Sequence, residues 1–208
     1  TDVPAQEVWG RVTAVVLAAG GARRFGTLKQ VQPWRGRPLV AYVTAQALAC
    51  PDIDRVIVVV GAEADRVQAA LLESLPGAAL DVVLVRNWAL GQSRSVRAGL
   101  EAATATSGDQ PSAVVFLLAD QPGITPELLS TLVTRHRTTL APVVAPRHAG
   151  RRGNPVLFDR ATWPEFARLS GDIGARPIIE AHRDSIAWVD WPTPEVLQDI
   201  DTPEDYRG

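Results

Sequence analysis

The segment "VTAVVLAAGGARRFGTLKQ", residues 12–30, decides the fold of this chain. It opens with a continuous apolar run that stops at Gly20 and Gly21, and two arginines and a lysine follow within a few residues. Continuous rather than alternating hydrophobicity predicts a strand that is covered on both faces. The segment therefore predicts a buried strand that opens into a flexible, positively charged loop.

Similar short apolar runs recur downstream, and amphipathic helical patterns separate them. The predicted strands are residues 13–17, 56–60, 81–85 and 113–118; the predicted helices are residues 38–50, 63–75, 93–105 and 125–140. Strands and helices alternating at this spacing predict βαβ units. We expect an α/β fold with a mostly parallel sheet and helices on both of its faces.

The second half is less regular and predicts a small β flap. Residues 142–146 and 154–158 read as two strands joined by the basic stretch "RHAGRRG". A short helix near 161–169, a glycine-rich turn, a strand near 185–190 and a terminal helix from Pro203 complete the pattern.

Composition limits the classes of protein that fit. With 208 residues and no break in composition, the chain predicts a single domain spanning residues 1–208. The net charge of -2 gives no global attraction to nucleic acid or to a membrane. Neither a leader nor an apolar run of about 18 residues is recognisable, so we expect no membrane partner and a cytoplasmic location.

Glycines beside cationic side chains favour a polyphosphate ligand. Glycines expose consecutive backbone N–H groups, and the loop after the first strand lies at the usual ligand-binding edge of an open α/β sheet. The P-loop spacing runs from Gly21 to Gly26, but Thr27 stands where the lysine must be, and the dinucleotide pattern G-x-G-x-x-G does not occur here. A plain glycine turn with solvated arginines is the alternative interpretation.

The same stretch resembles the signature of the MobA-like nucleotidyltransferases, L-A-x-G-x-x-x-R-x-G-x-x-K. The matching residues are Leu17, Ala18, Gly20, Arg24, Gly26 and Lys29. The resemblance implies a Rossmann-like nucleotidyltransferase fold in which residues 12–105 mainly bind the nucleotide and residues 106–208 provide the metal and acceptor part. It also implies a catalytic role for Arg24 and Lys29 and nucleotide binding by Leu17, Ala18, Ala19, Gly20, Gly21, Arg24 and Lys29.

The segment "NWALGQSRSVRAGL", residues 87–100, follows the third predicted strand and opens a helix. It resembles the base-recognition loop of the family, which implies that Gly91 and Ser95 lie near the base or the ribose. A plain helix cap formed by Ser93 or Ser95 is the alternative interpretation.

Two acidic motifs point to a metal. In "VVFLLADQPGI", Asp120 ends an apolar strand at the same sheet edge as Gly20, and Mg²⁺ binds through one or two carboxylates together with substrate phosphates. The family resemblance implies that Asp120 is catalytic and holds the metal, with Asp201 of "QDIDTPEDY" as the second carboxylate. Asp199 could exchange roles with Asp201, and Mn²⁺ could replace Mg²⁺, because oxygen ligands accept either ion.

The strings "RRGNPVLF" and "GDIGARPII" resemble the subgroup of the family that transfers a nucleotide to molybdopterin. The resemblance implies that Asn154, Pro155, Gly171, Asp172 and Gly174 border the acceptor. Taken alone, these strings could also be a turn entering a strand and a capped helix start.

The resemblance as a whole implies a Mg²⁺-dependent enzyme that transfers CMP from CTP to the phosphate of a molybdopterin-type cofactor and releases pyrophosphate. The alanine pair of "LAAG" resembles cytidylyltransferases, whereas guanylyltransferases of the family more often have "LAGG". The alternatives are a related enzyme using GTP or another phosphorylated acceptor, and a non-catalytic chaperone that delivers cofactor to a molybdenum hydroxylase apoenzyme. Two features differ from many relatives: Gln30 stands where many have Leu, and residues 147–152 are unusually basic.

Overall fold

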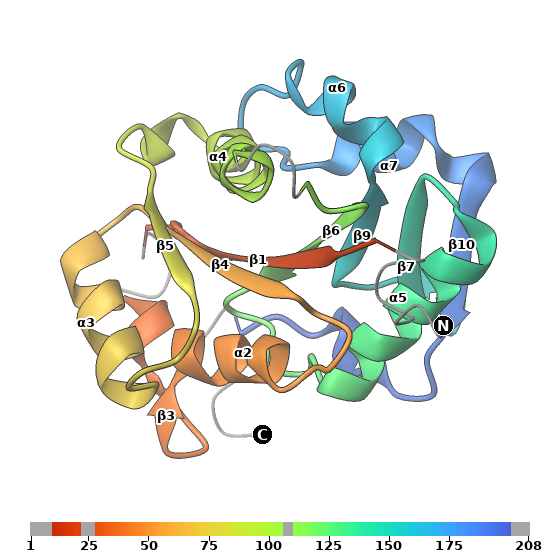
Figure 1. Cartoon of the computed structure of the whole chain (residues 1–208). Coiled ribbons are helices and arrows are strands. Elements are labelled where there is room, and N and C mark those ends of the chain that lie inside the picture. The colour runs from red at the N-terminus through yellow and green to blue at the C-terminus, as the bar shows by residue number, and fades with distance from the viewer. Residues whose placement is uncertain (1–9, 22–27, 106–109, 201–208) are drawn as a thin grey trace, which may run out of the picture.

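A computed structural model describes residues 10–21, 28–105 and 110–200, which form a single central sheet flanked by helices (Figure 1). The sheet has the strand order β10-β7-β9-β6-β1-β4-β5, and β8 pairs with β7. Its strands are β1 (Val12–Ala18), β4 (Arg55–Val60), β5 (Asp81–Leu84), β6 (Ala113–Leu118), β7 (Val143–His148), β8 (Arg151–Arg152), β9 (Val156–Asp159) and β10 (Ile186–Asp190).

The helices cover both faces of this sheet, as the sequence predicts. One face carries α2 (Leu39–Leu48), α3 (Ala64–Ser74) and α5 (Pro126–Thr139), and the other carries α4 (Gln92–Thr104), α6 (Trp163–Phe166) and α7 (Arg176–Ala181) (Figure 1). Strands β1, β4, β5 and β6 run parallel to one another, and β10 runs parallel to β7. Helices joining parallel strands have to return along a face of the sheet, which places them in two outer layers.

Strand β1 divides its side chains between two hydrophobic cores. Val12, Ala14, Val16 and Ala18 pack into the core under α2, α3 and α5, whereas Val15 belongs to the core under α4 and Leu17 packs against it. Successive side chains of a strand point to opposite faces, so a strand at the centre of a three-layer domain is largely apolar on both faces. In β1 only Thr13 is polar, and it is buried. This explains why the opening run of the sequence is continuous rather than alternating.

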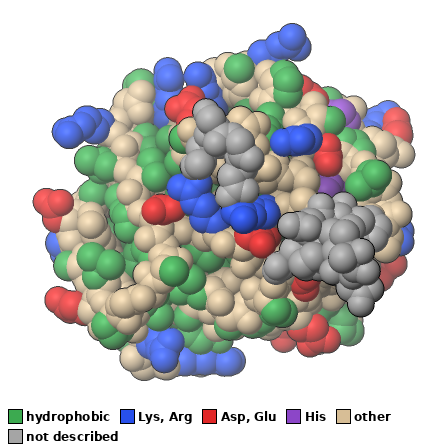
Figure 2. Space-filling model, viewed as in Figure 1, with side chains coloured by type: hydrophobic (Ala, Val, Ile, Leu, Met, Phe, Trp, Pro, Cys, Tyr) green, Lys and Arg blue, Asp and Glu red, His purple; other side chains and the backbone are tan. Residues whose placement is uncertain are grey.

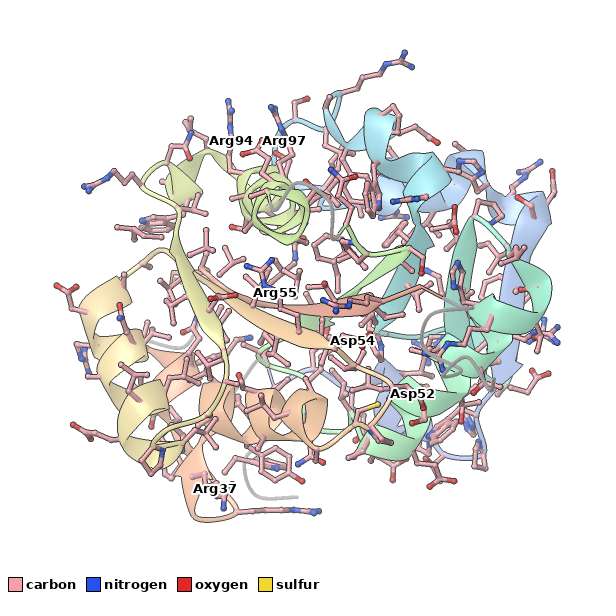
Figure 3. All side chains as sticks on the ribbon, in the orientation of Figure 1. Arg37, Asp52, Asp54, Arg55, Arg94 and Arg97 are labelled. Carbon is pink, nitrogen blue, oxygen red and sulfur yellow. The ribbon has the colours of Figure 1, made fainter. Side chains whose placement is uncertain are left out.

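Helix α4 lies tightly against β1. A Cβ atom on Gly99 would come within 2.5 Å of the Cγ1 atom of Val15, so only glycine permits this separation. Val96 and Leu100 are buried on the same side, while Arg94 and Arg97 project away from the sheet (Figure 3). The helix thus presents an apolar stripe to the core and its arginines to solvent.

The predicted flap is present and is continuous with the main sheet. Strand β9 pairs antiparallel with both β6 and β7, and β8 extends the hairpin by pairing with β7. Helix α7 lies where "GDIGARPII" offers a helix start as the alternative interpretation. Elements additional to those predicted include a 3₁₀ turn over Lys29–Val31 and a small hairpin of β2 (Pro33–Trp34) and β3 (Arg37–Pro38). The terminal helix predicted from Pro203 lies outside the described residues.

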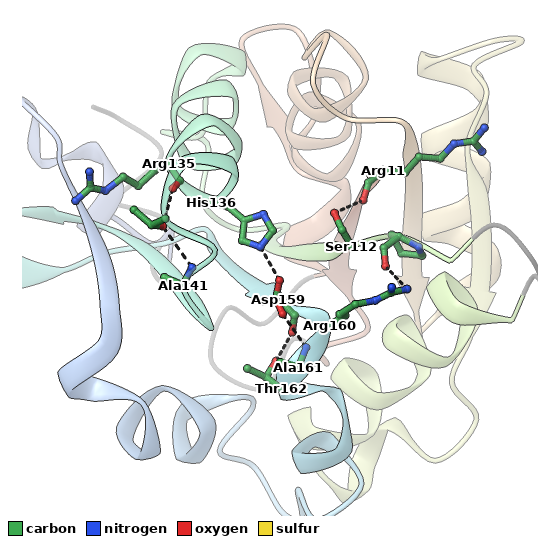
Figure 4. A network of polar contacts seen from close by, with 11 residues as sticks. Arg11, Ser112, Arg135, His136, Ala141, Asp159, Arg160, Ala161 and Thr162 are labelled. Atoms are coloured by element: carbon green, nitrogen blue, oxygen red, sulfur yellow. Dashed lines mark hydrogen bonds and ion pairs between the residues drawn. The ribbon is translucent and has the colours of Figure 1, made fainter. Parts of the chain in front are cut away.

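A polar network closes the sheet edge at which β1 and β6 begin (Figure 4). His136 on α5 is buried, and its Nε2 atom lies 2.8 Å from the Oδ2 atom of Asp159, at the end of β9. The other carboxylate oxygen of Asp159 accepts the N–H of Ala161 at 2.8 Å. These bonds join α5 to the sheet on the edge opposite to Gly20 and Asp120, and so belong to the scaffold.

Charged side chains of both signs are dispersed over the face shown in Figure 2, with hydrophobic side chains appearing in small groups between them. This mixture agrees with the small net charge of -2. No helix among the described residues has the length and apolar character needed to cross a membrane.

Candidate active site

A cleft of about 690 Å³ opens at the carboxyl ends of β1 and β6, where the sequence predicts the nucleotide site. Most of the predicted residues line it together: Leu17, Ala19, Gly20, Gly21, Lys29, Gly91, Ser95 and Asp120. In open α/β sheets, ligands bind outside the carboxyl ends of the strands. The parallel order of β4, β1 and β6 thus gathers segments that are about a hundred residues apart in the chain.

Lys29 and Asp120 form an ion pair in this cleft. The Nζ atom of Lys29 lies 2.7 Å from the Oδ2 atom of Asp120, and it also donates to the carbonyl oxygen of Ile200 at 2.7 Å. The two side chains are 19% and 27% exposed, so the pair is half-buried but open to a ligand. A cation already lies against the carboxylate that is predicted to hold a metal.

The segment before Asp201 is tied to the strand end that carries Asp120. The N–H of Ile200 donates to the carbonyl oxygen of Asp120 at 2.9 Å, and the amide of Gln121 donates to the carboxylate of Asp199. Asp199 therefore orients this segment through Gln121. Asp201, the predicted second metal ligand, lies outside the described residues.

The buried side chain of Gln30 donates hydrogen bonds to the backbone at the start of the glycine loop. Its side chain is 6% exposed, and its Nε2 atom donates to the carbonyl oxygen of Gly20 at 2.6 Å and to that of Ala18 at 3.4 Å. Two carbonyl acceptors identify the nitrogen of the amide, which leaves Oε1 buried and without a hydrogen-bond partner among the described residues. This polar side chain thus fixes the backbone at the end of β1.

Trp88 forms a wall of the cleft. A Cβ atom on Gly21 would come within 2.9 Å of its indole ring, and a Cβ on Gly61 would come within 2.7 Å of the tryptophan Cβ. The two glycines therefore admit a large aromatic side chain against the loop. An indole ring beside a loop that is expected to bind phosphates offers an apolar surface to a planar base or to a ribose.

The loop before α4 is in direct contact with the loop at Gly171. Gly91 has a φ of +115°, and a Cβ atom there would lie 2.4 Å from the backbone of Gly171. The Oδ1 atom of Asp172 accepts the N–H of Gln92 at 3.0 Å, and the oxygen of Gly171 accepts the N–H of Ser93 at 3.2 Å. Asp172 thus caps α4. The sequence interpretation gives this role to Ser93 or Ser95 and places Asp172 at the start of a helix of its own.

A second cavity of about 220 Å³ adjoins the cleft. Leu17, Gln92 and Leu118 line both spaces. Of the predicted acceptor residues, Asn154 and Gly174 line the second cavity, and Pro155 is buried beside it after a cis peptide bond. Gly171 and Asp172 instead contact the loop before α4, and Asp172 faces the first cleft.

One predicted nucleotide-binding residue, Ala18, does not line the cleft. Ala18 is 1% exposed and lies in the core beneath α2, with its carbonyl oxygen near Gln30. Arg24 and Asp201 lie outside the described residues. Conversely, Gln30 and Gln92 also line the cleft, although the family pattern does not indicate them. For Gln30, its position directly after Lys29 is a signal in the sequence that could have found it.

The donor set fits a hard divalent cation that is completed by substrate. Asp120 offers a carboxylate in the cleft, and a cationic ammonium group already lies against it. Within the described residues, no group of three His, Cys, Asp or Glu side chains could hold a metal ion by protein ligands alone. One or two carboxylates plus phosphate oxygens are what Mg²⁺ and Mn²⁺ commonly use beside nucleotides.

The fold and this cleft define the class of protein: a nucleotidyltransferase. The chain belongs to the MobA-like NTP transferase family, whose domain matches residues 14–186. This membership confirms the resemblance seen in the glycine and lysine motif.

Curated relatives carry several different activities. The bifunctional protein GlmU of Anaeromyxobacter sp. (strain Fw109-5) is 33% identical over 156 residues, 74% of this chain, which spans 31% of that protein's length. The 2-C-methyl-D-erythritol 4-phosphate cytidylyltransferase of Ralstonia nicotianae is 38% identical over 125 residues, 58% of this chain and 48% of the relative. The molybdenum cofactor guanylyltransferase of Rhodobacter capsulatus is 28% identical over 201 residues, 94% of this chain and 93% of the relative.

Solved structures agree on the fold. A homologue of the Mycobacterium tuberculosis protein Rv0371c, from Mycobacterium sp. strain JC1, is 35% identical with a TM-score of 0.79, covering 95% of this chain and 93% of its own. A manganese complex of Rv0371c is 28% identical with a TM-score of 0.75, covering 95% and 96%. A divalent metal in a relative is consistent with metal use in this family.

Proposed function

We propose that this protein transfers CMP from CTP to the phosphate of a molybdopterin-type cofactor and releases pyrophosphate, with Mg²⁺ as its metal. The observation that carries the proposal is the contact between Lys29 and Asp120 in a cleft that adjoins a second cavity. One space is large enough for a nucleotide, and the adjoining space can take a second substrate next to it.

The reaction joins two anions, so the protein mainly positions them and neutralises their charge. An oxygen of the acceptor phosphate attacks the α-phosphorus of CTP, and the bond from that phosphorus to the bridging oxygen of pyrophosphate breaks. A phosphate monoester is largely ionised near neutral pH, because its second pKa is about 6, so no general base is needed.

The residues divide this work. Lys29 supplies positive charge to the phosphates, together with the backbone N–H groups at Gly20 and Gly21 and with Arg24. Gly91 and Ser95 contact the base or ribose, and Asn154 and Gly174 border the acceptor. Asp120 and Asp201 would hold the divalent cation, which when bound would supply charge neutralisation at the phosphate oxygens.

Support for CTP comes from the alanine pair Ala18-Ala19 and from relatives named as cytidylyltransferases. Support for a molybdenum-cofactor acceptor comes from the relative that matches nearly the whole chain. That relative is named as a guanylyltransferase, which makes GTP the second candidate donor.

Pyrophosphate release tests the proposal. CTP, GTP, ATP and UTP are each incubated with Mg²⁺ and molybdopterin cofactor, using the wild type, Asp120→Asn and, as a control, Asp184→Asn, whose side chain is 94% exposed. Release with CTP, lost in Asp120→Asn and kept in Asp184→Asn, supports the proposal. Release with GTP alone overturns the donor, and tight cofactor binding without release favours the chaperone alternative.

A further inference from the structure

The second cavity has a wall of rigid apolar side chains. Phe116 and Phe158 meet there with ring centroids 5.9 Å apart at an interplanar angle of 71°, and Val96, Val156 and Ile179 add aliphatic surface. These side chains are all buried, so the shape of the cavity is set by the core. Such a wall suits a flat ring or another compact, largely apolar body.

Two guanidinium groups also line this cavity: Arg152 from β8 and Arg176 at the first residue of α7. Partial burial, and then the like charge of Arg176, lower the pKa of Arg152 from its usual range. The two positive charges therefore repel each other, and the charge of Glu180 offsets part of this repulsion. An anion bound to both arginines would relieve it further.

In the described part of the chain, the carboxylate of Glu180 acts on both arginines, and it balances their charge only in part. Arg152 forms no ion pair there and donates only to the adjacent carbonyl oxygen of Gly153, at 3.4 Å. Arg176 reaches Glu180 at 3.9 Å, between two exposed side chains. Arg147 on the same hairpin differs, because it makes two hydrogen bonds to Asp190, at 2.6 and 3.1 Å, and lies over Trp188.

We propose that Arg152 and Arg176 bind an oxyanion on the acceptor, distinct from the phosphate that receives the nucleotide. This inference rests on the proposed function. The reacting phosphate has to approach Lys29 and Asp120, and neither of these lines the second cavity. An anion held by the two arginines therefore belongs to another part of the acceptor, whose body lies against Phe116 and Phe158. Guanidinium groups suit this task because their planar N–H forks match the oxygens of an oxyanion.

Inorganic phosphate is the probe for the first experiment, and the readout is the NMR spectrum of the arginine Nε–H groups. The variants Arg152→Gln and Arg176→Gln assign the two signals. Both signals are expected to shift saturably in the wild type, and each single substitution is expected to weaken the response of the remaining arginine about tenfold. Arg183→Gln is the control, because that side chain is 74% exposed and lines neither cavity. Absence of a saturable shift, or an undiminished response in the variants, overturns the proposal.

Steady-state kinetics then tests the link to the acceptor. Arg152→Gln is expected to raise the KM for the acceptor about tenfold and to leave the KM for the nucleotide unchanged, while Arg152→Lys restores part of the loss. An unchanged acceptor KM, or an equal rise for the nucleotide, overturns the assignment. The phosphate titration requires no turnover. If the protein binds phosphate at the two arginines but transfers no nucleotide, the result contradicts the proposed function and not the anion site.

Discussion

The ammonium nitrogen of Lys29 lies 2.7 Å from a carboxylate oxygen of Asp120, so a lysine of the glycine loop neutralises the carboxylate at the end of β6. The same nitrogen donates to the oxygen of Ile200, whose N–H donates to the backbone of Asp120. Three distant segments thus meet at one charged group. A metal that binds Asp120 has to compete electrostatically with this ammonium group. The phosphates of a nucleotide could then accept hydrogen bonds from the ammonium group.

Lys29→Gln is therefore expected to bind Mn²⁺ about tenfold more tightly without nucleotide, because a competing positive charge is removed. The same variant is expected to transfer nucleotide about a hundredfold more slowly, because a charge on the phosphates is lost. Electron paramagnetic resonance of Mn²⁺ measures the first effect and pyrophosphate release the second. Weaker Mn²⁺ binding in Lys29→Gln would show that the lysine does not compete with the metal. The control is Asp120→Asn, which should lose Mn²⁺ binding.

Gln30 is expected to stabilise the glycine loop through its bond to the oxygen of Gly20. Gln30→Leu removes the donor from two carbonyl oxygens and should lower the free energy of unfolding by about 1–2 kcal/mol. Gln30→Glu should cost more, since a carboxylate would face these same oxygens. Urea unfolding of both variants measures the order, and a Glu variant as stable as the wild type would contradict it.

Gly91→Ala is expected to disturb the contact with Gly171, because both the positive φ and the 2.4 Å approach exclude a Cβ atom. Gly77→Ala is the matched control: its φ is +72° and nothing lies within 4 Å of the added atom. The control should lose about 1 kcal/mol of stability from backbone strain alone, while Gly91→Ala should lose more and also raise the nucleotide KM. If thermal unfolding showed equal losses of stability in the two variants, the close approach of Gly91 to Gly171 would not contribute to stability.

Asp172 is expected to act as the cap of α4 through its bond to the N–H of Gln92. Asp172→Ala should lower the free energy of unfolding by about 1 kcal/mol, whereas Asp172→Asn keeps an oxygen acceptor and should remain near the wild type. Denaturant unfolding distinguishes the two variants. Equal destabilisation by both would assign the effect to the charge rather than to the cap.

The order of strands and helices could be predicted because the inward faces of the buried elements are largely apolar. Strand β1 has to face two cores, and its seven residues alone indicate a three-layer domain. The residues of the glycine loop and Asp120 could be predicted for a similar reason, since the carboxyl ends of parallel strands meet at one edge.

Local sequence could not predict contacts between segments. Nothing near Asp172 indicates that it caps α4, because Gln92 is 80 residues away and only packing brings the two together. Similarly, the basic flap gives no sign of which arginine is neutralised. Arg147 pairs with Asp190 because β10 lies beside β7, while Arg152 is directed to a cavity.

Residue patterns within short segments were enough to predict the α/β layering and the family. The contact of Lys29 with Asp120, the bond of Gln30 to the glycine loop, and the position of Arg152 and Arg176 at one cavity became apparent from the folded chain alone. Hydrophobic periodicity is encoded locally, whereas the partner of a polar group depends on which distant strands become neighbours in the sheet.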